Sequence, residues 1–104
     1  MSAFLVSPEA EDDLKTIWRY LLGEADLATA NRIQNELLES FEGLAAHPGM
    51  GHKRPDLTRR DVLFKTLYQY MIVYRRTAAV EIVGVLHGKR NVKRILNVRL
   101  ADNP

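Results

Sequence analysis

The sequence predicts one α+β domain in which a two-helix hairpin packs on one face of an antiparallel sheet. The length of 104 residues is typical of a single domain, which we expect to span residues 1–104. The first half contains two runs of apolar residues at helical spacing. The second half contains three runs rich in β-branched and aromatic residues. With a short apolar run at the N-terminus, the element order is β-α-α-β-β-β.

Two amphipathic helices are expected after a short first strand. Residues 3–6 are apolar and predict the strand. Ser7-Pro8 predicts a helix start, because serine caps helix N-termini and proline fits the first helical position. This helix is expected to reach about Leu22. A second helix is predicted from a cap at Asp26 to the breakers at 47–49, and the short link makes the two helices antiparallel.

The second half is predicted to form the sheet. An irregular connector is expected over residues 47–60, which are rich in proline, glycine and basic residues. Strands are predicted at 62–64, 70–74 and 80–86, and their short links make them antiparallel neighbours. The last run is apolar at nearly every position, which indicates a central strand covered on both faces. The basic tail from Lys89 to Arg99 favours a short helix.

Charge is distributed unevenly along the chain. Residues 1–51 contain three basic and nine acidic side chains, a net charge of −6, whereas residues 52–104 contain twelve basic and four acidic ones, a net charge of +8. A basic half could meet an acidic partner or a nucleic acid. Solvated faces that segregate by sign would give the same pattern, so charge alone does not decide the function.

The composition argues against several classes of function. The chain has no cysteine, so disulfides and thiolate chemistry are excluded. The histidines His47, His52 and His87 lack tetrahedral ligand spacing, and we expect no metal site. Without a glycine-rich phosphate loop, no cofactor is expected either. No apolar run is long enough for a membrane span or a signal peptide, which predicts a cytoplasmic protein.

Four motifs occur in order along the chain. They are Ser7-Pro8-Glu9-Ala10-Glu11-x-Asp13-Leu14, His47-Pro48-Gly49-Met50-Gly51, Tyr70-x-Ile72-x-Tyr74-Arg75 and Val80-Glu81-Ile82-Val83-Gly84-Val85-Leu86-His87-Gly88-x-Arg90. With them the sequence resembles the ParE branch of the RelE/ParE toxins over nearly its whole length. The resemblance implies the toxin of a type II toxin–antitoxin pair, neutralised by a ParD-like antitoxin and directed at DNA gyrase. Relatives of RelE type instead cut mRNA on the ribosome, and because the fold is shared, the function must be argued from the site.

The residues favour a non-enzymatic protein over a nuclease. Metal-free RNA cleavage needs a proton acceptor, a proton donor and cations. Cations are plentiful. The resemblance implies that the nuclease branch uses a tyrosine or histidine late in the chain, but residues 91–104 contain no Tyr, His or Glu, which leaves His87 as the late candidate. A structural role explains His87 more simply: it would end a strand and form a local hydrogen bond. The nuclease alternative would use His87 as acid or base, with Arg60 and Arg90 stabilising charge.

Protein binding has the best support from the sequence. The segment 89–94 contains four basic residues beside apolar Ile95-Leu96, a surface that an acidic, amphipathic antitoxin segment would complement. The predicted contact residues are Arg60, Lys89, Arg90 and Arg94. Direct nucleic-acid binding is not expected, because no predicted element is shaped for a groove. A binding module without toxicity is a third alternative.

Two sets of apolar side chains have predicted positions. Tyr70 and Tyr74 occupy alternate positions of one strand and are expected to fill one face of the core. Leu22, Leu27 and Leu38 lie off the core stripes of the helices. They either form an exposed patch or close the hairpin, and the pattern favours neither.

Overall fold

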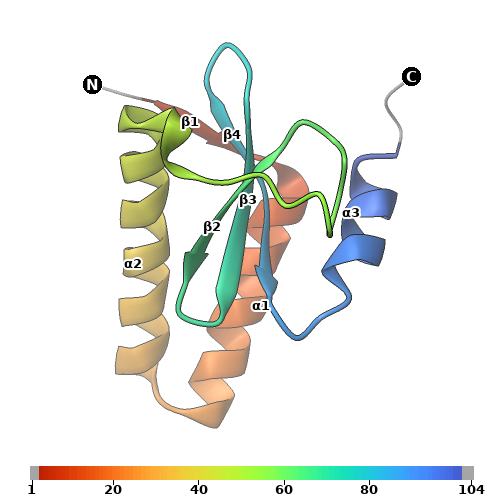
Figure 1. The fold of residues 1–104 in the computed structure, drawn as a ribbon. Helices are drawn as coiled ribbons and strands as arrows, with labels where there is room; N and C mark the ends of the chain where they lie inside the picture. The colour runs from red at the N-terminus through yellow and green to blue at the C-terminus, as the bar shows by residue number, and fades with distance from the viewer. Residues whose placement is uncertain (1–2, 102–104) are drawn as a thin grey trace.

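The computed structural model describes residues 3–101 and contains a four-stranded sheet with helices on both faces (Figure 1). The elements are β1 (Phe4–Val6), α1 (Pro8–Glu24), α2 (Leu27–Ala46), the 3-10 turn η1 (Pro48–Met50), β2 (Leu63–Leu67), β3 (Tyr70–Arg76), β4 (Val80–His87) and α3 (Val92–Arg99). The α+β class, the order β-α-α-β-β-β and the helix in the basic tail are therefore confirmed.

The sheet is mixed, so the expectation of a wholly antiparallel sheet was wrong. The strand order is β1-β4-β3-β2, and β1 pairs with β4 in parallel. The helical hairpin returns the chain to the end of the sheet at which β1 began (Figure 1). From there β2, β3 and β4 alternate in direction, so β4 runs the same way as β1 and accepts it on its free edge. The predicted central place of β4 is confirmed.

The two helices begin where their caps predict. The Ser7 hydroxyl accepts the Ala10 N–H (3.1 Å), and the Asp26 carboxylate accepts the Thr29 N–H (2.7 Å). Helix α1 extends to Glu24, two residues past the predicted Leu22. The Ala25 N–H closes the extended end by donating to the Leu21 carbonyl (2.8 Å).

Replacing Ser7 with alanine is expected to lower the free energy of unfolding by about 1 kcal/mol, because the Ala10 N–H would lose its capping partner. Urea unfolding followed by circular dichroism measures the loss. Ser40 in the middle of α2 is the control. Ser40→Ala is expected to be neutral or slightly stabilising, since alanine has the higher helix propensity. Equal losses in the two variants would contradict the capping role.

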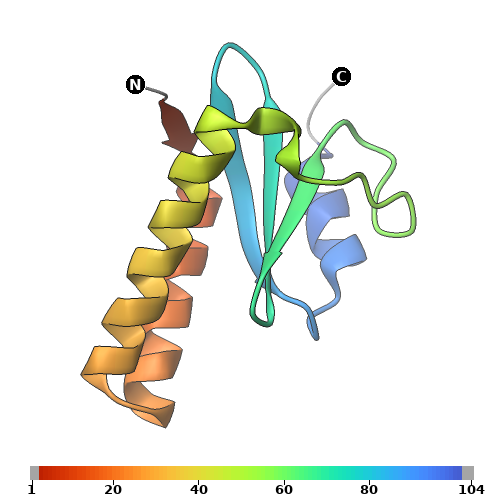
Figure 2. The same cartoon turned by 60° about the vertical axis from the view of Figure 1, so that its left-hand side comes forward.

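Two apolar cores lie on opposite faces of the sheet, each beneath one of the helix layers that Figure 2 shows. Helices α1 and α2 cover one face, where Leu37, Phe41 and the strand residues Tyr70 and Tyr74 are buried. Helix α3 covers the other face. The predicted core positions of Tyr70 and Tyr74 are confirmed, and the two covered faces explain why β4 is apolar at nearly every position.

The edge strand β2 and its turn differ from the prediction. Strand β2 spans Leu63–Leu67 instead of 62–64, because this edge strand is only partly covered toward its end, where Lys65 is half-buried and Thr66 is exposed. A two-residue turn at Tyr68 and Gln69 joins it to β3, and Tyr68 adopts a left-handed conformation (φ 56°). The Tyr68 hydroxyl donates to Glu36 of α2 (2.7 Å), which attaches the turn to the helical layer.

The connector after α2 is anchored by Tyr74. The Tyr74 hydroxyl accepts the Gly51 N–H (2.8 Å) and donates to the Pro48 carbonyl (2.7 Å). A Cβ at Gly51 would lie 2.5 Å from that hydroxyl oxygen. Next along the chain, His52 forms two backbone hydrogen bonds with Phe64 of β2 (2.9 and 2.8 Å). The basic connector is therefore attached to the sheet at its start.

An ion pair closes the part of the β4 edge that β1 does not reach. Strand β1 ends at Val6, opposite Ile82. Beyond that point the Asp13 carboxylate accepts the Val85 N–H (2.9 Å), and the Arg99 guanidinium donates to the Val83 carbonyl (3.2 Å). The two side chains also form a double ion pair (2.6 and 2.8 Å). This pair, which we call the edge pair, connects α1 and α3, on opposite faces of the sheet, through the β4 edge.

Candidate partner-binding groove

The candidate site is a hollow that lies where β4 passes into α3, beside the β2–β3 turn. Its volume is about 530 Å³. Tyr70 and His87 are cross-strand partners at this end of the sheet, and the Gly88 N–H donates to the Gln69 carbonyl (2.9 Å). These contacts hold the turn and the β4–α3 loop together. We call this hollow the cationic groove; its charged lining residues are Arg54, Lys89, Arg90 and Lys93.

Positive charge in this groove is largely uncompensated. Arg54 donates two hydrogen bonds to Asp56 (2.9 and 2.8 Å), and hydrogen bonding to this carboxylate raises the pKa of the guanidinium. Lys89, Arg90 and Lys93 are exposed, and none forms an ion pair within residues 3–101. Cations without a partner cost little in water and are available to an acidic ligand.

His87 has a local structural role at the edge of the groove. Its Nδ1 atom accepts the Lys89 N–H (3.0 Å), so the neutral imidazole carries its proton on Nε2. Its ring also packs edge-on against Tyr70, with centroids 5.8 Å apart. This is the arrangement expected of a histidine that ends a strand and hydrogen-bonds locally.

The structure does not bring the three residues of the nuclease alternative together. His87 and Arg90 line the cationic groove, whereas Arg60 lies in another hollow beside Arg76. Arg76 pairs with the first residue of β4 and Tyr70 with the last, so these hollows lie at opposite ends of the sheet. At about 3.3 Å per strand residue, the ends are roughly 20 Å apart. Arg60 therefore cannot stabilise charge on a group that reacts at His87.

The predicted contact residues divide in the same way. Lys89 and Arg90 both line the cationic groove, and Arg94 is exposed on α3 outside its lining. Arg60 is at the far end. Arg54, Lys93 and Tyr68 also line the groove but were not among the predicted contact residues. The two-residue spacing between β2 and β3, once recognised as a hairpin, would have placed Tyr68 beside the end of β4.

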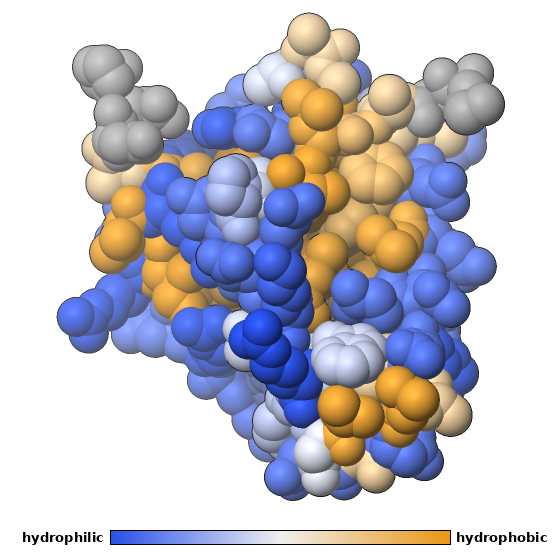
Figure 3. Space-filling view, turned by 180° about the vertical axis from the view of Figure 1, so that it is seen from behind, coloured by the Kyte–Doolittle hydropathy of each residue, from blue (hydrophilic) through white to orange (hydrophobic). Residues whose placement is uncertain are grey.

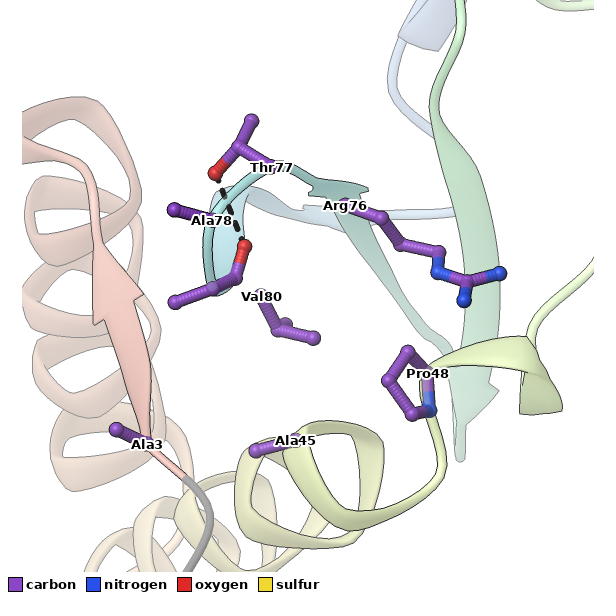
Figure 4. Close-up of a pocket in the computed structure, with 8 residues that line it drawn as sticks. Ala3, Ala45, Pro48, Arg76, Thr77, Ala78 and Val80 are labelled. Atoms are coloured by element: carbon purple, nitrogen blue, oxygen red, sulfur yellow. Dashed lines mark hydrogen bonds between the residues drawn. The ribbon is translucent and has the colours of Figure 1, made fainter.

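Other surfaces offer less chemistry. A hollow near the β3–β4 turn is lined by Ala3, Ala45 and Pro48, with Arg76 as its charged side chain (Figure 4). It has no side chain suited to proton transfer. Figure 3 shows an apolar patch near the foot of the helical hairpin. Leu22, Leu27 and Leu38, which either form a patch or close the hairpin, are exposed.

Neither a metal-binding cluster nor a membrane-spanning helix occurs within residues 3–101. No group of three or more His, Cys, Asp or Glu side chains in this range could hold a metal ion. No helix in this range is long and apolar enough to cross a membrane. A small α+β domain with a largely uncompensated cationic groove is typical of the class of proteins that recognise macromolecules through their surface.

Comparison with known proteins identifies the family within that class. The chain belongs to the ParE toxins of type II toxin–antitoxin systems, whose family profile, described as "ParE toxin of type II toxin-antitoxin system, parDE", matches residues 4–92. It is 32% identical over 94 residues to Toxin ParE1 of Caulobacter vibrioides, with 89% of this chain and 96% of the relative covered. The match reaches Lys89 and Arg90 but ends at the start of α3.

A solved structure has the same fold. The structure titled "Chromosomal ParDE TA system from P. aeruginosa" superposes with a TM-score of 0.72 over 84% of this chain and 96% of that chain. The sequence identity is 18%, so the likeness concerns the fold alone. The resemblance to ParE toxins that the motifs indicated is confirmed, and the protein is the toxin component of a type II system.

Proposed function

We propose that this toxin inhibits DNA gyrase without catalysing a reaction, that a ParD-like antitoxin neutralises it, and that the cationic groove binds its partners in the cytoplasm. Membership of the ParE family supports a ParD-like antitoxin as the partner and DNA gyrase as the target. The observation that carries the choice of surface is the set of exposed cations Lys89, Arg90 and Lys93, which have no ion-pair partner within residues 3–101. Catalysis is not part of the proposal, because Arg60 lies far from His87.

The purified chain is expected to inhibit DNA supercoiling by gyrase, and the double variant Lys89→Glu/Arg90→Glu to lose at least about tenfold in inhibitory potency. Two reversed charges in a contact surface would repel an acidic partner surface, and such repulsion costs several kcal/mol. A supercoiling assay over a range of toxin concentrations measures the change.

The matched control is Lys15→Glu/Arg19→Glu. Both side chains are exposed on α1 outside the groove, and the change in net charge is the same. This variant should inhibit gyrase as the unmodified chain does. Equal losses in both double variants would assign the effect to net charge instead of the groove. Unimpaired supercoiling with excess unmodified toxin would refute gyrase as the target, and cleaved message on translating ribosomes would restore the nuclease alternative.

A further inference from the structure

A second hollow adjoins the cationic groove. It lies between α1 and the end of β4, and its volume is about 290 Å³. Ile17, Tyr20 and Val85 give it largely apolar walls. Tyr70, His87 and Arg90 line both this hollow and the cationic groove. We call it the Tyr70 cavity; it lies directly beside the positively charged surface.

The fold explains why space is left at this place. The edge pair fills the β4 edge as far as Val85, and the cavity starts there, with Asp13 in its wall. Figure 2 shows the helical hairpin diverging from the sheet toward its foot. No strand of the described chain lies beside the end of β4 on this edge, because β1 stops opposite Ile82. The cavity is thus produced by a short first strand and a tilted helix layer.

Tyr70 contributes a polar group without a partner. Its side chain is 2% exposed, and its hydroxyl has no hydrogen-bond partner among residues 3–101. Burial raises the pKa of this phenol, with a smaller contribution from Tyr20, while Gln69 offsets part of the rise. A buried hydroxyl that makes no hydrogen bond lowers the free energy of unfolding. A ligand that supplied an acceptor would remove this cost.

The polar groups around the cavity are mainly donors. The Tyr70 hydroxyl, the Nε2–H of His87 and the Arg90 guanidinium can all donate. The one carboxylate in the wall, Asp13, uses both oxygens to accept from Arg99 and from the Val85 N–H. A ligand that complements this set has an apolar body and an acceptor, and beside Arg90 the best acceptor is a carboxylate.

We propose that the Tyr70 cavity anchors an acidic peptide by taking one apolar side chain, with a neighbouring carboxylate of the peptide on the Tyr70 hydroxyl and Arg90. The volume is at the lower end of the range for ligand pockets and suits a single side chain. The adjoining groove, with Lys89 and Lys93, would hold the acidic residues on either side of the anchor. The inference rests on the proposed function in one respect, namely that an antitoxin segment of this chemistry is the natural source of the peptide.

The test is an NMR titration of the isotope-labelled full chain with the synthetic peptide acetyl-Glu-Phe-Asp-Glu-amide. We expect the backbone amide signals of Val85, His87 and Arg90 to shift. Replacing the phenylalanine with serine, or the three acidic residues with their amides, should weaken binding at least tenfold. Shifts confined to the groove residues around Lys93, or equal affinity for the three peptides, would overturn the inference.

Tyr70→Phe is the decisive variant. It should bind the peptide about tenfold more weakly, and its melting temperature should be unchanged or higher because an unpaired buried hydroxyl is removed. The matched control is Thr77→Val just past the opposite end of β3 and outside both hollows, where the hydroxyl that is removed donates to the Ala79 carbonyl. This control should bind the peptide within twofold of the unmodified chain and should melt at the same or a lower temperature. Unchanged peptide affinity in Tyr70→Phe would overturn the role of the hydroxyl.

Two further arms separate the possible sources of failure. Titration with free 3-phenylpropionate tests for a small organic acid, and binding as tight as that of the peptide would overturn the peptide assignment. The supercoiling assay is run on the same samples. Gyrase inhibition without peptide binding would refute only the cavity inference, whereas peptide binding without gyrase inhibition would refute only the proposed target.

Discussion

Asp13→Ala is expected to lower the free energy of unfolding by about 3–5 kcal/mol, because it removes one partner of a buried ion pair. The Arg99 side chain is 16% exposed and would lose both of its bonds to Asp13. The Val85 N–H would lose its acceptor as well. Each 1 kcal/mol corresponds to roughly 4–8 °C in the melting temperature of a domain of this size. Urea and thermal unfolding measure the loss.

The neighbouring Asp12 provides the control. It is exposed on α1, so Asp12→Ala should change the stability by less than about 0.5 kcal/mol. The double variant Asp13→Leu/Arg99→Met should recover much of the stability lost in Asp13→Ala, because apolar side chains of similar volume can replace a buried ion pair. If Asp13→Ala were as stable as Asp12→Ala, the edge pair would not hold α1 and α3 together.

Gly51→Ala is expected to be the second severe variant, with a loss of about 3 kcal/mol. The new Cβ would lie 2.5 Å from the Tyr74 hydroxyl oxygen, 2.7 Å from Tyr74 Cε1 and 2.9 Å from the Phe64 carbonyl oxygen. Overpacking of this kind costs about 1–3 kcal/mol. Displacement of the tyrosine would also break its hydrogen bonds to Gly51 and Pro48, at about 1 kcal/mol each. Chemical unfolding measures the total.

Gly49, two residues earlier in the same connector, is the matched control. A Cβ there would meet no atom within 4 Å, so Gly49→Ala should be neutral or slightly stabilising. Tyr74→Phe alone leaves the Gly51 N–H and the Pro48 carbonyl without their partner and should destabilise the chain. Combined with Gly51→Ala, it should cost less than the sum of the two single losses, because both changes act on one contact. Strict additivity would show that the clash does not occur.

The helices could be predicted because their signals are local. Ser7 and Asp26 each bond an N–H three residues ahead, so a short stretch of sequence contains the whole cap. The connector after α2 could be recognised as irregular for the same reason. Its anchor could not, because the hydroxyl of Tyr74 lies 23 residues from the Gly51 N–H that it accepts. The alternation of strand residues showed that Tyr74 is buried but not which polar group it would meet.

The mixed sheet and the edge pair depend on tertiary packing. Three residues of β1 contain no information on whether they join a sheet in parallel or antiparallel fashion. Asp13 and Arg99 are 86 positions apart in the sequence. In the sequence, Asp13 is one of several acidic residues near a helix start, and Arg99 is one cation of a basic tail. Their meeting follows from α1 and α3 flanking the same edge of β4.

For the candidate site, chain proximity was a good guide and charge alone was a poor one. Lys89 and Arg90 were predicted as contact residues from a local basic cluster, and they lie together in the groove. Arg60 was added on its charge, but the connector carries it to the other end of the sheet. The unpaired hydroxyl of Tyr70 could not be predicted, because the alternation that buries the ring does not reveal its hydrogen-bond partners.

The edge pair also bears on how the free toxin behaves in solution. An uncovered strand edge is a template for strands of other molecules and a cause of aggregation. The Asp13 carboxylate and the Arg99 guanidinium occupy the bonding positions at Val83 and Val85 that an intruding strand would use. Displacing them would leave two largely buried charges without partners, which is costly. The chain therefore protects itself against edge-to-edge association at the point where its first strand stops short.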